Sequence, residues 1–217
     1  MSELVSWEEE TPVSVRFGDG FYGRQDGLAE ARHVFLSGND LLARTGNLHV
    51  GELGFGTGLN LAALLHDRGG PFRYTSFEMY PLAATDADRA LARWPELERE
   101  REAIVAAWSA LVAGEPVAVA HGVTVRIVPG DATRTLPRWT GTADAWFLDG
   151  FAPDRNPDLW TPAVLQSVFD HTAPGGTLAT YCAAGHVRRA LAAAGFEVER
   201  RRGAPGKRHM TVARRAA

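Results

Sequence analysis

The sequence lacks several features that would point to other classes of protein. Cys182 is the single cysteine among 217 residues, which excludes an internal disulfide and any zinc site built on several cysteines. The seven histidines are scattered without the short spacings of a ligand set, so we expect no metal. No apolar run approaches the roughly 18 residues of a membrane span, and the acidic start at residues 1–3 is unlike a signal peptide. We therefore expect a cytoplasmic protein with no membrane association.

The sequence also lacks a large excess of one charge, because its net charge is only −3. The basic and acidic residues are, however, unevenly distributed along the chain. The last 33 residues carry a net charge of +7, and the 184 residues before them carry −10. A basic surface at the C-terminus could follow the phosphates of a nucleic acid. Arginines that are simply solvated on a helix and an edge strand are the alternative.

The chain does contain a regular alternation of strand and helix patterns. Strands are predicted over residues 48–53, 72–77, 122–128, 144–149 and 177–181, with helices at about 59–68, 82–93, 96–113, 161–171 and 185–194. This order predicts an α/β fold with a mostly parallel sheet and helices on both faces. The pair of short strands at 196–201 and 209–213 predicts one antiparallel strand at or near the edge.

The N-terminal part is different in character. Residues 13–40 are rich in glycine and predict a short strand or hairpin followed by a helix at about 28–36. Because this segment precedes the first strand of the main sheet, it is free to fold across a ligand site. We expect residues 1–45 to form an extension over the mouth of that site, and residues 46–217 to form the main domain.

The most informative stretch is the turn after the first strand of the sheet. Glu52 lies near the end of the strand, and Gly54, Gly56 and Gly58 follow at alternate positions before a helix. Glycine allows positive φ and lets a ligand lie directly against the backbone at a helix N-terminus. A dinucleotide site needs G-x-G-x-x-G, but Leu59 replaces the last glycine, and Glu52 would repel a pyrophosphate. S-adenosylmethionine (SAM), with its ammonium and sulfonium, therefore fits better than NAD or FAD; a purely structural turn is the third alternative.

Acidic residues end four consecutive strands, at the edge where open α/β sheets bind ligands. They are Glu52, Glu78, Asp131 and Asp149. Glu78 could accept both ribose hydroxyls, and Asp131 could accept from the adenine amino group. Asp149 should reach the reacting end of the bound ligand, where a carboxylate can hold an attacking amine and accept its proton. These positions predict methyl transfer to nitrogen with Asp149 as the catalytic residue, whereas an Asp that only caps its loop is the alternative.

Four segments carry a family resemblance: residues 54–60 (GFGTGLN), 144–153 (DAWFLDGFAP), 156–161 (NPDLWT) and 174–180 (PGGTLAT). They resemble the methyltransferase domain of the MnmC-type tRNA 5-methylaminomethyl-2-thiouridine biosynthesis enzymes, and the similarity covers nearly the whole chain. The resemblance implies a Rossmann-like SAM-dependent methyltransferase fold over residues 46–217. It also implies N-methylation of the 5-aminomethyl group of the (2-thio)uridine at the wobble position of tRNA, position 34.

The resemblance also assigns roles to individual residues. Asp149 would lie at the amine and Phe151 beside the uracil, while Lys207 and Arg208 match a basic pair that either contacts tRNA or holds the last hairpin. Two-domain members of the family continue into a flavin-dependent oxidase, so we expect a separate protein to supply that step where it is needed.

The predicted contacts form two sets. The cofactor set is Glu52, Gly54, Phe55, Gly56, Gly58, Asn60, Glu78, Met79, Asp131 and Asp149, and the substrate set is Gly150, Phe151, Lys207 and Arg208. Tyr22, Glu30 and Arg32 could close over the methionine end of SAM, and Trp160 could line the base pocket. Three other functions stay open: a SAM-dependent N-methyltransferase of a small-molecule amine, an NAD-type oxidoreductase, and a non-catalytic SAM- or tRNA-binding protein.

Overall fold

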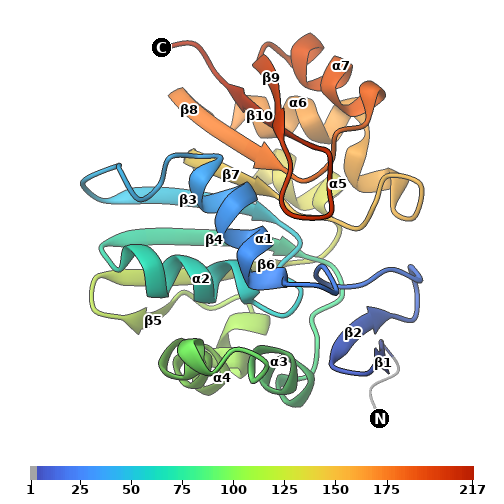
Figure 1. Ribbon diagram of the computed structural model, residues 1–217. Helices are drawn as coiled ribbons and strands as arrows, with labels where there is room; N and C mark the ends of the chain where they lie inside the picture. Colours follow the sequence, from blue (N-terminus) through green and yellow to red (C-terminus); the bar gives the residue numbers. More distant parts are fainter. Residues whose placement is uncertain (1–3) are drawn as a thin grey trace.

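The computed structural model, shown in Figure 1, describes residues 4–217. Residues 1–3, where the expected extension starts and on which the expectation of no signal peptide partly rests, lie outside the described residues. Over residues 4–217, none of the helices combines the length and the apolar character needed to cross a bilayer.

The molecule is built on an eight-stranded sheet with the strand order β5-β6-β4-β3-β7-β8-β10-β9 (Figure 1). The strands are β3 (Leu48–Leu53), β4 (Phe72–Glu78), β5 (Val117–Ala120), β6 (Val123–Pro129), β7 (Ala143–Leu148), β8 (Thr172–Thr180), β9 (Glu197–Arg202) and β10 (His209–Arg214). The central strands from β6 to β8 are parallel. The chain runs from β3 outward to β4 and β6 and then returns to β7 on the other side of β3. This reversal places a ligand crevice at the carboxyl ends of β3 and β7.

Helices cover both faces of the sheet. One face is covered by α1 (Gly27–Ala31), η1 (Arg32–Ser37), α2 (Leu59–Arg68), α3 (Ala84–Leu91), η2 (Pro95–Leu97) and α4 (Glu98–Val112), and the other by α5 (Ala132–Thr135), η3 (Leu136–Arg138), η4 (Pro157–Trp160), α6 (Pro162–Asp170) and α7 (Gly185–Ala194). Strand β7 alternates between the two cores: Ala145 and Phe147 belong to the first, Trp146 and Leu148 to the second. The predicted fold class is confirmed.

The antiparallel part of the sheet is larger than expected. Strand β10 is antiparallel to both β8 and β9, as the sequence predicts for the end of the chain. The opposite edge carries β5, which pairs antiparallel with β6 and which we did not expect. It has four residues and follows a Gly-Glu-Pro turn, so its pattern is too short to separate from a loop.

Two predicted elements differ in their bounds. Strand β8 begins at Thr172, because Pro174, Gly175 and Gly176 lie inside the strand where the register against β7 shifts; they form an irregularity in the strand rather than a turn before it. The helix expected at 28–36 is two elements, a short α1 and the π-helix η1. The hairpin of β1 (Val5–Glu8) and β2 (Thr11–Ser14) precedes them.

Candidate active site

A pocket of about 630 Å³ lies at the carboxyl ends of β3, β4, β6 and β7, within the usual range for small-molecule sites. The structure brings most of the predicted residues to it: Gly54, Phe55, Gly56, Asn60, Glu78, Met79, Asp131, Asp149, Gly150, Phe151 and Lys207 all line the pocket. Glu52, Gly58 and Arg208 do not line it. Tyr22 and Glu30 do, as the sequence suggests.

The glycine turn has the backbone conformation that only glycine adopts easily. Gly54, Gly56 and Gly58 have φ of 89°, 54° and 82°. A Cβ on Gly54 would lie 2.4 Å from the carbonyl oxygen of Asp149, so this glycine is needed for the turn to lie against the loop after β7. Gly58 is the N-cap of α2, which explains its position just outside the pocket.

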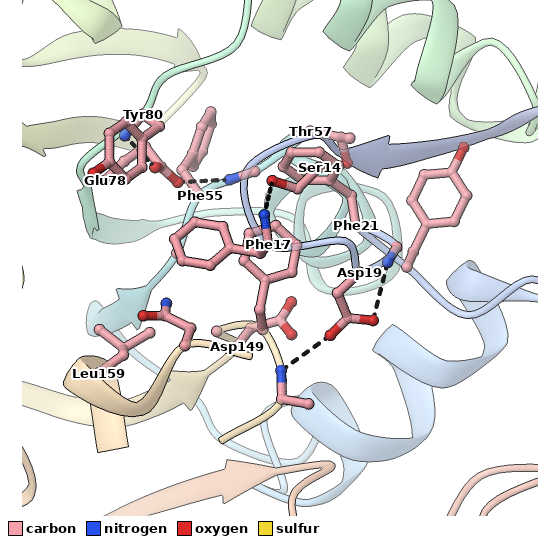
Figure 2. A pocket seen from close by; sticks show the side chains of 18 of the residues that line it. Ser14, Phe17, Asp19, Phe21, Phe55, Thr57, Glu78, Tyr80, Asp149 and Leu159 are labelled. Atoms are coloured by element: carbon pink, nitrogen blue, oxygen red, sulfur yellow. Dashed lines mark hydrogen bonds between the residues drawn. The ribbon is translucent and has the colours of Figure 1, made fainter. Parts of the chain in front are cut away.

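Glu78 is fixed in place by the backbone around it. One oxygen, Oε2, accepts from the Gly56 N–H at 3.1 Å, and the other, Oε1, accepts from the Tyr80 N–H at 2.7 Å (Figure 2). Each carboxylate oxygen has a further lone pair, so the group can still accept from a ligand hydroxyl. Asp131 caps α5, with Oδ1 accepting from the Thr133 N–H at 2.9 Å.

Asp149 is connected to a second carboxyl through Asn60. The Asn60 amide nitrogen Nδ2 lies 2.6 Å from Asp149 Oδ2 and 3.0 Å from Glu52 Oε1. Ser76 Oγ donates to the other oxygen of Glu52 at 2.7 Å. Glu52 is only 1% exposed and lies beneath the pocket rather than in it.

The environment moves both carboxyls into a range that is useful at neutral pH. Burial raises the pKa of Asp149 to about 7; the Asn60 hydrogen bond opposes this rise, Glu30 adds to it and Lys207 opposes it. Burial also raises the pKa of Glu52 to about 8. A carboxyl that titrates near 7 is well matched to proton transfer under physiological conditions.

The loop between β2 and α1, residues 15–26, lies across the pocket and is here called the cover loop. The ring centroids of Phe17 and Phe21 lie 4.8 and 5.2 Å from the ring centroid of Phe151. Asp19 Oδ2 accepts from the Ala152 N–H at 3.1 Å (Figure 2). Sequence reasoning did not single out these three residues of the loop. Their signal was the run of aromatic residues among glycines, which fixes no partner.

The basic pair divides between two places. Lys207 Nζ lies 2.5 Å from Glu30 Oε1 and 4.1 Å from the centre of the Tyr181 ring, so it connects the last hairpin to α1. Tyr181 in turn donates to the Gly150 carbonyl. These contacts favour the holding role over the tRNA contact for Lys207, whereas Arg208 is exposed.

Two further candidates lie outside the pocket lining. Arg32 pairs with Asp67 at 2.8 Å and Glu96 at 2.9 Å, which directs it away from the ligand. Trp160 is buried and donates from Nε1 to the Phe151 carbonyl at 2.8 Å, so it supports the loop after β7. Over residues 4–217, no group of three or more histidine, cysteine or acidic side chains could hold a metal ion.

These residues fit SAM. The glycine turn allows close approach of a ligand to the backbone, Glu78 keeps a free lone pair on each oxygen for a ligand hydroxyl, and the carboxylates of Glu78, Asp131 and Asp149 all line the pocket. That acidic lining suits a ligand with an ammonium and a sulfonium better than one with a pyrophosphate.

Comparison with known proteins agrees with this chemistry. Residues 95–216 match the family described as S-adenosyl-L-methionine-dependent methyltransferase. The "tRNA 5-methylaminomethyl-2-thiouridine biosynthesis bifunctional protein MnmC" of Ectopseudomonas mendocina is 41% identical over 95% of this chain and 34% of its own length. The protein of the same name from Pseudomonas aeruginosa PAO1 is 43% identical over the same shares. The chain thus spans about a third of the length of these curated relatives.

Solved structures show the same fold. MNMC2 from Aquifex aeolicus superposes with a TM-score of 0.77 at 23% identity, covering 94% of this chain and 65% of that one. SAM-bound CalS10, an amino pentose methyltransferase from Micromonospora echinaspora, gives 0.56 at 16% identity, covering 89% and 93%. Both likenesses support the Rossmann-like architecture. From the match over residues 95–216, together with this fold and this pocket, the chain belongs to the family of S-adenosyl-L-methionine-dependent methyltransferases.

Proposed function

We propose that this protein transfers a methyl group from SAM to the 5-aminomethyl group of the wobble uridine in tRNA, giving 5-methylaminomethyl-2-thiouridine or its oxygen counterpart. The observation that carries the proposal is the placement of Asp149 in the pocket, two residues before the aromatic ring of Phe151. The names of the relatives at 41 to 43% identity support the choice of substrate.

The chain's own groups perform the proton chemistry. SAM, when bound, supplies an electrophilic methyl group on a sulfonium. Asp149 accepts a proton from the ammonium form of the substrate, which frees the nitrogen lone pair for attack. As the new N–C bond forms, the bond between that methyl carbon and sulfur breaks, and the positive charge passes from sulfur to nitrogen. Asp149, now in its acid form, still accepts a hydrogen bond from the amine through its carbonyl oxygen, and it afterwards releases its proton to solvent. Much of the remaining acceleration comes from holding the amine in line with the methyl group.

The surroundings of Asp149 suit a base on a single strand. Phe151, with Phe17 and Phe21 beside it, offers aromatic surface for a uracil ring, and aromatic stacking is the common way to hold an unpaired base. The anticodon loop is already single-stranded, so no duplex has to be opened. We assign this contact to the 149–153 loop.

Two wider expectations belong to the same proposal. Residues 1–45 act as an extension that covers the pocket of a methyltransferase domain at 46–217; the cover loop, which lines the pocket, supports this division. The reaction takes place in the cytoplasm, where a tRNA substrate is available, and needs no metal.

The test is nucleoside mass spectrometry of tRNA carrying 5-aminomethyl-2-thiouridine after incubation with the protein and SAM. We expect conversion to the methylaminomethyl nucleoside, and a loss of about 100-fold or more in Asp149→Asn, because that variant cannot accept the proton. Asp144→Asn is the matched control, since Asp144 lies at the opposite end of β7 and accepts from the His49 N–H. Intact SAM binding without any conversion would reject the tRNA substrate and favour a small-molecule amine.

A further inference from the structure

The side chains beneath Asp149 form a continuous chain of contacts from α2 to β4. Asn60 is the second residue of α2, and its amide lies between Asp149 and Glu52, which is in turn bound by Ser76. Asn60 is 6% exposed and Glu52 1%. Since both are nearly removed from solvent, their contacts are made with little competition from water.

The hydrogen-bond donors of the Asn60 amide are both used within the protein. An amide nitrogen carries two hydrogens, and in this structure Nδ2 lies within hydrogen-bond distance of Asp149 Oδ2 and Glu52 Oε1. With one hydrogen directed to each carboxyl, none remains for a ligand. Both oxygens of Glu52 likewise face protein donors. The Asn60 amide nitrogen and both Glu52 oxygens, which the sequence suggested as cofactor contacts, are therefore taken up by protein partners. Asn60 still lines the pocket, where its carbonyl oxygen Oδ1 is the group left for a ligand.

We propose that Asn60 is a positioning residue for Asp149 and is itself held in place by Glu52, to which Ser76 donates. It fixes Asp149 through Oδ2 and leaves Oδ1 to receive the proton of the substrate amine. Its place in the first turn of α2 makes this anchor rigid. The inference rests on the proposed function, because it takes Asp149 as the proton acceptor.

Several charged and titratable groups surround Asp149, and the test must separate Asn60 from them. Glu52 and the nearby Tyr74 lie below it, on β3 and β4. Glu30 on α1, Lys207 in the last hairpin, Tyr181 after β8 and Asp19 in the cover loop lie around it. Among the groups that stabilise the charged form, Asn60 contributes most to lowering the pKa of Asp149. Loss of its amide should therefore raise that pKa.

The experiment is a direct titration of the Asp149 carboxyl carbon by NMR in the full chain without ligand, assigned with Asp149→Asn. We expect Asn60→Leu to move the midpoint upward by about one pH unit. Because Glu52 and Asp149 interact, the titration is repeated in Glu52→Gln, where a single midpoint remains. The methyl-transfer rate of Asn60→Leu should fall on the acidic side of its pH profile by the same shift. We expect about fivefold lower activity than the wild type at pH 7 and equal activity at high pH. SAM affinity should change by less than about twofold, a factor worth only about 0.4 kcal/mol.

Asn39→Leu is the matched control. Asn39 is a fully buried amide that donates to the carbonyls of Phe35 and Trp146 and accepts from Thr177. Its loss should destabilise the fold comparably without moving the Asp149 midpoint. If Asn60→Leu fails to fold, Asn60→Asp has nearly the same shape and places a third carboxyl against the pair, which should raise the midpoint further.

An unchanged Asp149 midpoint in the Asn60 variants overturns the inference, as does a large loss of SAM affinity with no change in the midpoint. A shifted midpoint in a protein that fails to methylate tRNA would reject the proposed function alone, because the NMR titration needs no substrate.

Discussion

At the residue scale, Glu52 is a carboxyl that titrates inside the protein core. Burial raises its pKa to about 8, and the charge of Asp149 adds to the effect, while Asn60 and Ser76 oppose it. An unfolded glutamate titrates near 4.3. Between these two pH values the native protein holds a proton that the unfolded chain releases. The stability that this group contributes is therefore fully present at low pH and is lost as the pH rises through about 8.

We expect Glu52→Gln to weaken this pH dependence in the ligand-free protein. Glutamine keeps the shape and an acceptor for Asn60 but has no titrating proton. From pH 5 to 8, the free energy of unfolding of the wild type should fall relative to the variant, by at most about 1.4 kcal/mol per pH unit. Urea unfolding at several pH values measures it. The comparison cancels His49, whose pKa burial lowers to about 4 and which acts with the opposite sign.

Exposed Glu102 provides the control, since Glu102→Gln should give a curve parallel to the wild type. A parallel curve for Glu52→Gln as well would contradict a raised pKa at this position.

The site residues differ in how far the sequence reveals them. Glu78 and Asp149 could be placed because each follows a parallel strand, and the ends of such strands meet at one edge. The sequence does not reveal where the Glu52 side chain points. That depends on which face of β3 lies toward the side chains of Asn60 and Ser76. That choice is made by packing across three elements, and a strand in a sheet covered on both faces shows no alternation that would reveal it.

At the element scale, the cover loop is held to the loop after β7 through one carboxylate. Asp19 accepts from the Ala152 N–H with Oδ2 and from the Gly20 N–H with Oδ1, and the aromatic contacts of Phe17 and Phe21 with Phe151 lie on either side. Hydrogen bonds to a charged group contribute about 1.5–3 kcal/mol each. The closed position of the loop therefore depends strongly on Asp19.

We expect Asp19→Ala to open the cover loop more often. Arg16 and Arg24 are exposed trypsin sites within it, and cleavage there should be about tenfold faster, the factor that corresponds to about 1.4 kcal/mol. Limited proteolysis followed by mass spectrometry of the fragments measures this. Asp154→Ala, at an exposed position of the loop after β7, should leave the rate unchanged. Equal rates for both variants would show that contacts other than the Asp19 carboxylate hold the loop closed.

The elements themselves were mostly predictable, for physical reasons that also explain the exceptions. Strands β3, β4 and β7 are buried on both faces and so appear as apolar runs, and Gly195 ends α7 with φ of 115° as a C-terminal glycine should. Strand β5 is a short edge strand with half its residues exposed, which gives little pattern. The π-helix η1 has the same apolar spacing as an α-helix, so only the packing of the chain decides its hydrogen bonding.

At the scale of the whole molecule, the nine basic residues that give the last 33 residues their net positive charge gather at one end. They lie in α7, β9, the hairpin loop between β9 and β10, and β10 with the residue after it, which Figure 1 shows at the opposite end of the sheet from α3 and α4. Lys207 of that loop lines the pocket, so the basic end is continuous with the site. A tRNA whose wobble base enters the pocket would thus have its backbone near Arg202 and Arg208.

We therefore expect the double variant Arg202→Ala, Arg208→Ala to bind tRNA more weakly and with a smaller dependence on salt. Each phosphate contact removed should lower the slope of log affinity against log salt by about 0.7 to 0.9, so the two together should lower it by about 1.5. SAM affinity should not change, because neither side chain lines the pocket. Arg99→Ala on α4, an exposed position at the far end of the sheet, is the matched control. An unaltered slope in the double variant would mean that these arginines are only solvated and that tRNA approaches from another side.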